Sequence, residues 1–315
     1  MRSGRVMFAF SLFSCLLQLT CASGNTSSES DPAEGLEIPS TDKGVQLGFE
    51  VKVEPGREIV VCRELVLPGD AAIEVGRVEH ASSPGTHHVH AYRTSTPADN
   101  VSPDAFDCGD LAGPLLYTAE SEVESTHFQP GVGIKLGKGE VVRLELHYLN
   151  TGSATVEANL RLNLWFAQAK LTAEAGSFFM YNHDLAVPPH GSATARMHCE
   201  IPVDIAITSL LPHVHTHGTA ERIVLSGKGL GKPRLLVDSR GYGDLEARTF
   251  DDAPVLVKAG QALDFECDFK NGSDQELVEG TSPTTAEMCA ILGSYFPRMP
   301  PEAEWCTLPG SGPLP

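Results

Sequence analysis

The chain has few basic and few aromatic side chains for its 315 residues. Lysine and arginine number 23 against 41 acidic residues, for a formal charge of −18, and aromatic residues make up 7%. Binding to nucleic acid or to an anionic membrane needs clustered basic side chains, so this balance argues against both partners. The hydrophobic share of 41% is still enough to form cores, which predicts one large domain or two of ordinary size.

Long apolar runs are also missing. Residues 6–17 form an apolar run after Arg2 and Arg5, which is too short to cross a bilayer but typical of a signal peptide. We therefore predict a signal peptide over residues 1–22 and no transmembrane segment. The protein is expected to be exported, to the extracellular space, the periplasm or the cell surface.

The end of this leader can be interpreted in two ways. Cleavage after Ala22 or Ser23 would release the chain. Alternatively, Cys21 closes the apolar run and is similar to the lipid-modified cysteine of a bacterial lipobox, which would leave the protein lipid-anchored. Residues 23–36, rich in Ser, Asn, Asp and Glu, are predicted to be a flexible tether.

Cysteine usage agrees with export. Cys15 and Cys21 belong to the predicted leader. Six cysteines remain, and an even number in an oxidising compartment predicts three disulfides whose pairing the residues alone leave open. They are Cys62, Cys108, Cys199, Cys267, Cys289 and Cys306.

The hydrophobic pattern is that of strands, with no amphipathic helix of 12 residues. Val142, Leu144, Leu146 and Tyr148 alternate with polar residues, as in a half-buried strand. Similar runs occur at 58–62, 154–166, 205–211, 222–225 and 262–269, separated by Gly and Pro turns. This pattern predicts an all-β sandwich or jelly roll.

An internal match suggests two related halves. Residues 138–150 align with 259–271, with a Gly, a Glu and an Asn at matching positions, and a cysteine and a His-Val-His segment precede each in the same order. We predict two tandem jelly-roll-like antiparallel β-sandwich domains, 37–171 and 172–315. Because strand patterns are simple, a chance match is the alternative.

Histidines gather in three places that suit metal binding. These are His87, His88 and His90, then His147, then His213, His215 and His217. Side chains two apart on a strand point the same way, so His215 can share a metal with His217 or His213, and His88 with His90. His87 and His88 could do so only at an irregular strand end. His80, His127, His183, His190 and His198 are expected to be surface or hydrogen-bonded residues.

Two pairs of segments resemble a known family. Val214-His-Thr-His-Gly218 and Gly280-Thr-Ser-Pro-Thr-Thr-Ala-Glu-Met-Cys289 resemble the second copper site of the ascorbate-dependent type II copper monooxygenases, which include peptidylglycine α-hydroxylating monooxygenase and dopamine β-hydroxylase. His87-His88 and the segment Leu144-Glu-Leu-His147-Tyr resemble the first site. The resemblance runs over nearly the whole mature chain in the same order.

The resemblance implies two copper ions per chain, one on each domain, facing a shared cleft. The first would be held by His87, His88 and His147, and the second, which binds O₂, by the catalytic set His215, His217 and Met288. A thioether favours Cu(I) and is a poor zinc ligand, which agrees with copper. The implied disulfides are Cys267–Cys289 and Cys199–Cys306, which leaves Cys62–Cys108 by exclusion.

The implied activity is hydroxylation of a C–H bond with O₂ and two electrons from ascorbate or a similar reductant, by a monomer acting on a small-molecule substrate. His213, Ala290 and Leu292 stand where the peptidylglycine enzyme has the residues that hold a peptide carboxylate, which argues against peptide amidation. Three alternatives remain: an exported copper-binding protein without turnover, a single-metal cupin-like enzyme using His213, His215 and His217, and a structural β-sandwich with incidental histidines.

Overall fold

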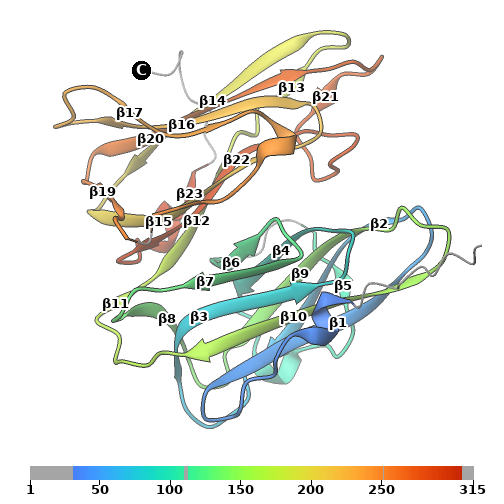
Figure 1. Cartoon of the computed structure of the whole chain (residues 1–315), viewed down its shortest axis with the longest axis vertical. Helices are drawn as coiled ribbons and strands as arrows, with labels where there is room; N and C mark the ends of the chain where they lie inside the picture. Colours follow the sequence, from blue (N-terminus) through green and yellow to red (C-terminus); the bar gives the residue numbers. More distant parts are fainter. Residues whose placement is uncertain (1–30, 110–112, 251, 307–315) are drawn as a thin grey trace, which may run out of the picture. The chain divides into compact units, whose positions relative to one another are not determined.

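The structure is a computed structural model that describes residues 31–109, 113–250 and 252–306. These residues are almost entirely strands and turns (Figure 1), so the predicted all-β sandwich fold is confirmed. No helix among them is long and apolar enough to cross a membrane. The predicted signal peptide, Cys21 and the first part of the tether lie outside the described residues.

The tether prediction is wrong for residues 31–36. Helix α1 (Pro32–Gly35) starts there, and the backbone N–H of Ala33 donates to the Asp31 carboxylate at 2.8 Å. The other Asp31 oxygen accepts hydrogen bonds from the Ser83 hydroxyl and from Asn159 Nδ2. Asp31, one of the polar residues that suggested a solvated segment, instead caps this turn and attaches it to neighbouring strands.

The first half of the chain forms two sheets. One has the order β1 (Gly44–Val53), β10 (Val156–Phe166), β3 (Ile73–Ser82), β8 (Val132–Leu136), β11 (Ala173–Glu174), with β7 (Val123–His127) beside β3. The other has the order β5 (Phe106–Asp107), β2 (Glu58–Val66), β9 (Val141–Leu149), β4 (Thr86–Arg93), β6 (Leu115–Ala119). One hydrophobic core contains Val78 and Leu162 of the first sheet with Val89 and Leu146 of the second. Packing through this shared core makes the pair a sandwich.

The second half also forms two main sheets. One has the order β18 (Arg248–Thr249), β15 (Ile205–Val214), β22 (Cys289–Phe296), β12 (Gly176–Tyr181), β23 (Trp305–Cys306), with β19 (Val255–Val257) on β15. The other has the order β14 (Ser192–Ile201), β20 (Gln261–Lys270), β16 (Gly218–Gly227), β17 (Arg234–Ser239), and β13 (Ala186–Val187) pairs with β21 (Leu277–Val278). Ile207 and Ile291 share a core with Ile223 and Phe265.

The same strand pairing occurs in both halves. The neighbours β1–β10–β3 correspond in chain order to β12–β22–β15, and β2–β9–β4 correspond to β14–β20–β16. We call this shared order of strands the strand frame, and residues of the predicted repeat stabilise it. Asn150 Nδ2 donates to the carbonyls of Val53 and Ala154, and Asn271 Nδ2 donates to those of Val187 and Gln275. Residues from Asp31 onward form one compact unit, so the division into domains at residue 171 stays a prediction.

The His-Val-His part of the predicted repeat is wrong. His88 and His90 lie on β4, which pairs with β9 and β6, whereas His213 lies on β15, which pairs with β22. The two segments therefore lie on strands that do not correspond. The segment His213–His215 lies at the end of β15. The segment His88–His90 lies near the start of β4, whose counterpart in the second half is β16.

The three predicted disulfides are present. The structure links Cys62 to Cys108, Cys199 to Cys306 and Cys267 to Cys289. The last bridge joins β20 to the start of β22, immediately after Met288. Disulfide crosslinks of this kind fit an oxidising compartment.

Candidate metal centre

Strands β4 and β9 present a polar face opposite the core. Val89 and Leu146 point into the first hydrophobic core, so the alternating side chains of His88, His90, Glu145 and His147 share the other face. In the antiparallel register His88 lies opposite His147, and His90 lies opposite Glu145. Residues from both halves cover this face: Tyr92 and Leu115 of the first pack with Phe179, Leu211, Met288, Ala290 and Leu292 of the second. The polar face is therefore buried.

A bulge brings His87 to the same place. The β4–β9 register shifts between Thr86 and His88, so His87 has no partner of its own on β9. Such a bulge re-aims a side chain that would otherwise point to the opposite face. Ligand atoms of His87, His88 and His147 lie within 4.8 Å of one another. The three residues expected at the first copper site thus come together, at the strand irregularity that a shared site requires.

These imidazoles each leave one ring nitrogen free. The His147 Nε2–H donates to Glu58 Oε1 at 2.9 Å, and the His88 Nε2–H donates to Glu145 Oε1 at 3.2 Å. Nδ1 of both rings, and Nε2 of His87, are buried without a partner among the described residues. In metal sites, a histidine ligand commonly binds the ion through one ring nitrogen while a carboxylate holds the N–H of the other. His88 and His147 have this arrangement. The residues present therefore fit a metal ion.

Burial also keeps these rings neutral, as metal binding requires. It lowers the pKa of His87 to about 4 and holds the pKa of His88 well below its ordinary value. Burial raises the pKa of the Glu145 carboxyl to about 7, although Tyr92 and Arg143 lower it.

The second histidine group lies at the end of β15 and in the turn that follows. The His215 Nδ1–H donates to the Ala286 carbonyl at 3.2 Å, and the His217 Nδ1–H donates to Glu287 Oε1 at 3.0 Å. The Glu287 carboxylate also accepts the backbone N–H groups of His215 and His217. The segment just before Met288 therefore holds both predicted ligands, each through Nδ1. Burial lowers the pKa of His215 to about 2, so its ring is neutral.

His213 has a different partner from its neighbours. Its Nδ1–H donates to Glu120 Oε1 at 2.9 Å. Although burial lowers it, the Glu120 carboxylate raises the pKa of His213 above its ordinary value. Ligand atoms of His213 and His215 lie within 4.8 Å of His87, and the groups this close in the described part of the chain do not include His217. The two predicted sites therefore adjoin at His87.

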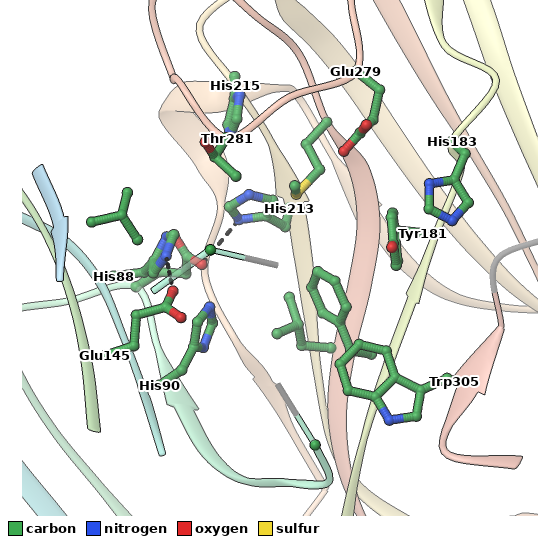
Figure 2. A pocket seen from close by; sticks show the side chains of 17 residues that line it. His88, His90, Glu145, Tyr181, His183, His213, His215, Glu279, Thr281 and Trp305 are labelled. Carbon is green, nitrogen blue, oxygen red and sulfur yellow. Dashed lines mark hydrogen bonds and ion pairs between the residues drawn. The ribbon is translucent and has the colours of Figure 1, made fainter. Parts of the chain in front are cut away.

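A cavity of about 680 Å³ opens onto both groups. Its lining includes His88, His215 and Met288 but not His217. Figure 2 shows His88, His90 and Glu145 on one side of the cavity, and Tyr181, His183 and Trp305 on the other. The described lining also contains the carboxylates of Glu120 and Glu279 and no Lys or Arg side chain. This charge disfavours an anionic ligand.

The remaining histidines follow their expected class. His80 is buried, with Nδ1 bonded to the Tyr117 hydroxyl and Nε2 to the Ser121 carbonyl. His190 and His198 are exposed and bonded to Asp274 and Asp264, and His127 is exposed. His183 is exposed too, yet its ring lies at the cavity, 4.4 Å from that of Tyr181.

The sequence reasoning missed the carboxylates that hold the rings. Glu58, Glu120, Glu145 and Glu287 each contact a histidine of the centre. Two of them carried a local signal, because Glu145 precedes His147 by two residues on an alternating strand and Glu287 directly precedes Met288. Glu58 and Glu120 come from other strands and loops, so only the fold brings them in.

Comparisons with known proteins add no function. No protein-family model and no curated protein matches the chain. Similar solved structures include a protein from the triple jelly-roll turret of an archaeal virus, with a TM-score of 0.24 and 9% identity over 81% of this chain and 59% of that one. Others are an infectious bursal disease virus Gx strain chain (0.21, 9%, 83% and 75%) and the exported PBSX protein XepA (0.20, 13%, 80% and 86%). Likeness at this level carries no argument about fold or function.

Proposed function

We propose that this protein is an exported copper-dependent monooxygenase that hydroxylates a C–H bond of a small molecule, using O₂ and two electrons from ascorbate or a similar reductant. One observation carries the proposal. Buried imidazoles from both halves, each held at one ring nitrogen, adjoin at a cavity whose wall also contains the thioether of Met288. The three disulfides support the proposed export.

The donor atoms favour copper at both proposed sites. Copper supplies one-electron redox chemistry and O₂ activation when bound. His87, His88 and His147 would hold the first ion through nitrogens that otherwise have no partner. His215, His217 and Met288 would hold the second, and the soft thioether of Met288 selects for Cu(I) over zinc.

The surrounding residues of the chain have positioning roles. Glu58 fixes the His147 ring at Nε2 and leaves Nδ1 for a ligand bond. The Ala286 carbonyl holds the His215 ring and Glu287 holds the His217 ring, each at Nδ1, which leaves Nε2 of these two rings for a ligand bond. Phe179, Tyr181 and Trp305 form an aromatic wall on one side of the cavity. Since the described lining has no Lys or Arg side chain, the cavity suits a small substrate without a carboxylate, in agreement with the sequence expectation against peptide amidation.

Geometry disfavours the cupin-like alternative. A single metal held by His213, His215 and His217 needs all three ligand atoms close together, and in the described part of the chain these three do not form such a group. The close group contains His87 in place of His217. The carrier alternative uses the same ligands as the enzyme, so turnover is what separates the two.

The test combines copper counting with oxygen uptake on the purified full chain. We expect His147→Ala to bind one copper ion fewer than wild type, at the first site, and His215→Ala to bind one fewer, at the second. The exposed control His198→Ala should bind both ions. Wild-type protein with ascorbate should consume O₂ in step with product when screened against small amines and phenols. Copper bound at both sites without coupled product would identify a carrier. An unchanged copper count in both His147→Ala and His215→Ala would overturn the proposal.

A further inference from the structure

We propose that His88, His90 and Glu145 form an additional metal site, of the two-histidine, one-carboxylate type, that binds a divalent ion of the Fe(II) or Zn(II) class. The site lies beside the proposed first copper site and shares His88 with it. His90 and Glu145 are ligands of neither proposed copper site, and Glu145 there only holds the His88 ring, so the inference goes beyond the proposed function.

Strand geometry places the three side chains together. His88 and His90 are two residues apart on β4, and Glu145 lies directly opposite His90 on β9. The His88 and His90 rings have centroids 4.4 Å apart, and ligand atoms of all three residues lie within 4.8 Å of one another. Figure 2 shows the His90 ring and the Glu145 carboxylate turned toward the same space below His88.

The spacing between donor atoms already suits one ion. His88 Nε2 lies 3.2 Å from Glu145 Oε1. Two ligand atoms that bind one zinc-sized ion, with bonds of about 2.0–2.2 Å and tetrahedral to octahedral angles, are separated by roughly 3.0–3.5 Å. An ion can therefore replace the Nε2 proton in this hydrogen bond with little movement of either side chain, and the proton is released to solvent. With an ion at the first copper site as well, His88 would bridge the two ions as an imidazolate.

An unpartnered nitrogen points to a ligand. His90 is 5% exposed, and its Nδ1 has no hydrogen-bond partner among the described residues. A buried polar atom without a partner destabilises the folded chain, and a bond to a metal ion would remove that cost. His88, His90 and Glu145 all line the 680 Å³ cavity, which offers an ion a route in and leaves coordination positions open.

The two adjoining sites differ in charge and in the nitrogen they use. His88 Nε2 faces Glu145, whereas His88 Nδ1 has no partner and is left for the set with His87 and His147. A carboxylate with two imidazoles is the donor set of non-haem Fe(II) and many zinc sites, while all-imidazole and thioether sets suit copper. The extra carboxylate thus selects a different ion from its neighbours.

The experiment counts Zn(II) bound to the metal-free full chain after equilibrium dialysis, together with the binding isotherm. We expect His90→Leu and Glu145→Gln each to bind one Zn(II) fewer than wild type. His90→Gln, which keeps polarity and size, should behave like His90→Leu and so guards against loss through misfolding. The control His198→Ala should match wild type.

His147→Ala separates this inference from the proposed function. It removes a first-site ligand only, so a double variant with His90→Leu should lose two ions where each single variant loses one. If His90→Leu, His90→Gln and Glu145→Gln keep the wild-type zinc count and affinity while His147→Ala loses an ion, the additional site does not exist and the proposed copper sites are untouched.

Discussion

The two halves share one strand frame but place their histidines on opposite sides of the same turn. In the first half, His87, His88 and His90 follow the turn from β3 into β4. In the second half, His213 and His215 precede the turn from β15 into β16, and His217 lies within it. The backbone confirms that the turns correspond, because Leu149 N–H donates to the Gly85 carbonyl and Lys270 N–H to the His217 carbonyl. One turn of the frame thus supplies ligands from both halves.

Corresponding positions have taken different tasks. Glu145 and Glu266 occupy the same place in the repeat. Glu145 is bonded to His88 at the metal centre, whereas Glu266 pairs with Arg196 at 3.2 Å and with Arg222. The strand frame depends on the turn and on the Asn contacts. The outward side chains of its central strands can therefore differ, so that Glu145 holds a histidine while Glu266 forms ion pairs with arginines.

Met288→Ile has the largest expected effect, because it disables only the proposed copper site of the second half. Isoleucine keeps the apolar volume but removes the sulfur, so we expect product formation to stop and Cu(I) affinity at His215 and His217 to fall, while copper at His147 stays. Product analysis with ascorbate and Cu(I) titration are the measurements. The control Met197→Ile, a buried core methionine, should cost less than about 1.5 kcal/mol and keep turnover. Coupled turnover in Met288→Ile would remove Met288 from the oxygen site.

His80 lies on β3, the strand that corresponds to β15, but it does not belong to the metal centre. Both of its nitrogens are bonded, and burial lowers its pKa to about 4. The unfolded chain therefore takes up the proton first as the pH falls below 6.5, so this contribution to stability is complete above pH 6.5 and is lost toward pH 4. From the shift, the loss is about 3 kcal/mol.

Urea unfolding at pH 7 and pH 4 measures this effect in wild type and in His80→Gln. The variant should lose about 3 kcal/mol less than wild type over the same interval, because glutamine does not titrate. Equal pH dependence in the two proteins would show that the pKa of His80 is the same in the folded and unfolded chains.

Asn150 and Asn271 test whether the halves depend on the frame equally. Each amide serves two backbone carbonyls, and its oxygen accepts the N–H of Gly152 or Ser273. We expect Asn150→Ala and Asn271→Ala each to lower the free energy of unfolding by about 2 kcal/mol, because the carbonyls lose partners. Exposed Asn100→Ala should change it by less than about 0.5 kcal/mol. A large effect at only one asparagine would mean that the repeat is not structurally equivalent.

Sequence reasoning reached much of the fold because strand periodicity is local. The alternation at Val142–Tyr148 falls within β9, and the cysteine pairs form as the family resemblance implied. It failed at residues 31–36, where the Asp31 carboxylate accepts hydrogen bonds from a backbone N–H and from two side chains. It also failed to relate the two His-Val-His segments correctly, since order along the chain does not reveal which strands pair.

Local pattern wrongly placed His215 and His217 on the strand of His213, which ends at Val214. By itself it determined that this is a disulfide-bonded β protein and that His88 shares a strand face with His90. Those features follow from composition and from the two-residue period of a strand. Only the tertiary structure decided that His87 turns inward at a bulge, that His90 faces Glu145, and that Glu58, Glu120 and Glu287 hold the rings. These contacts join residues far apart in sequence, so they depend on strand register and on packing between sheet faces, which no local pattern encodes.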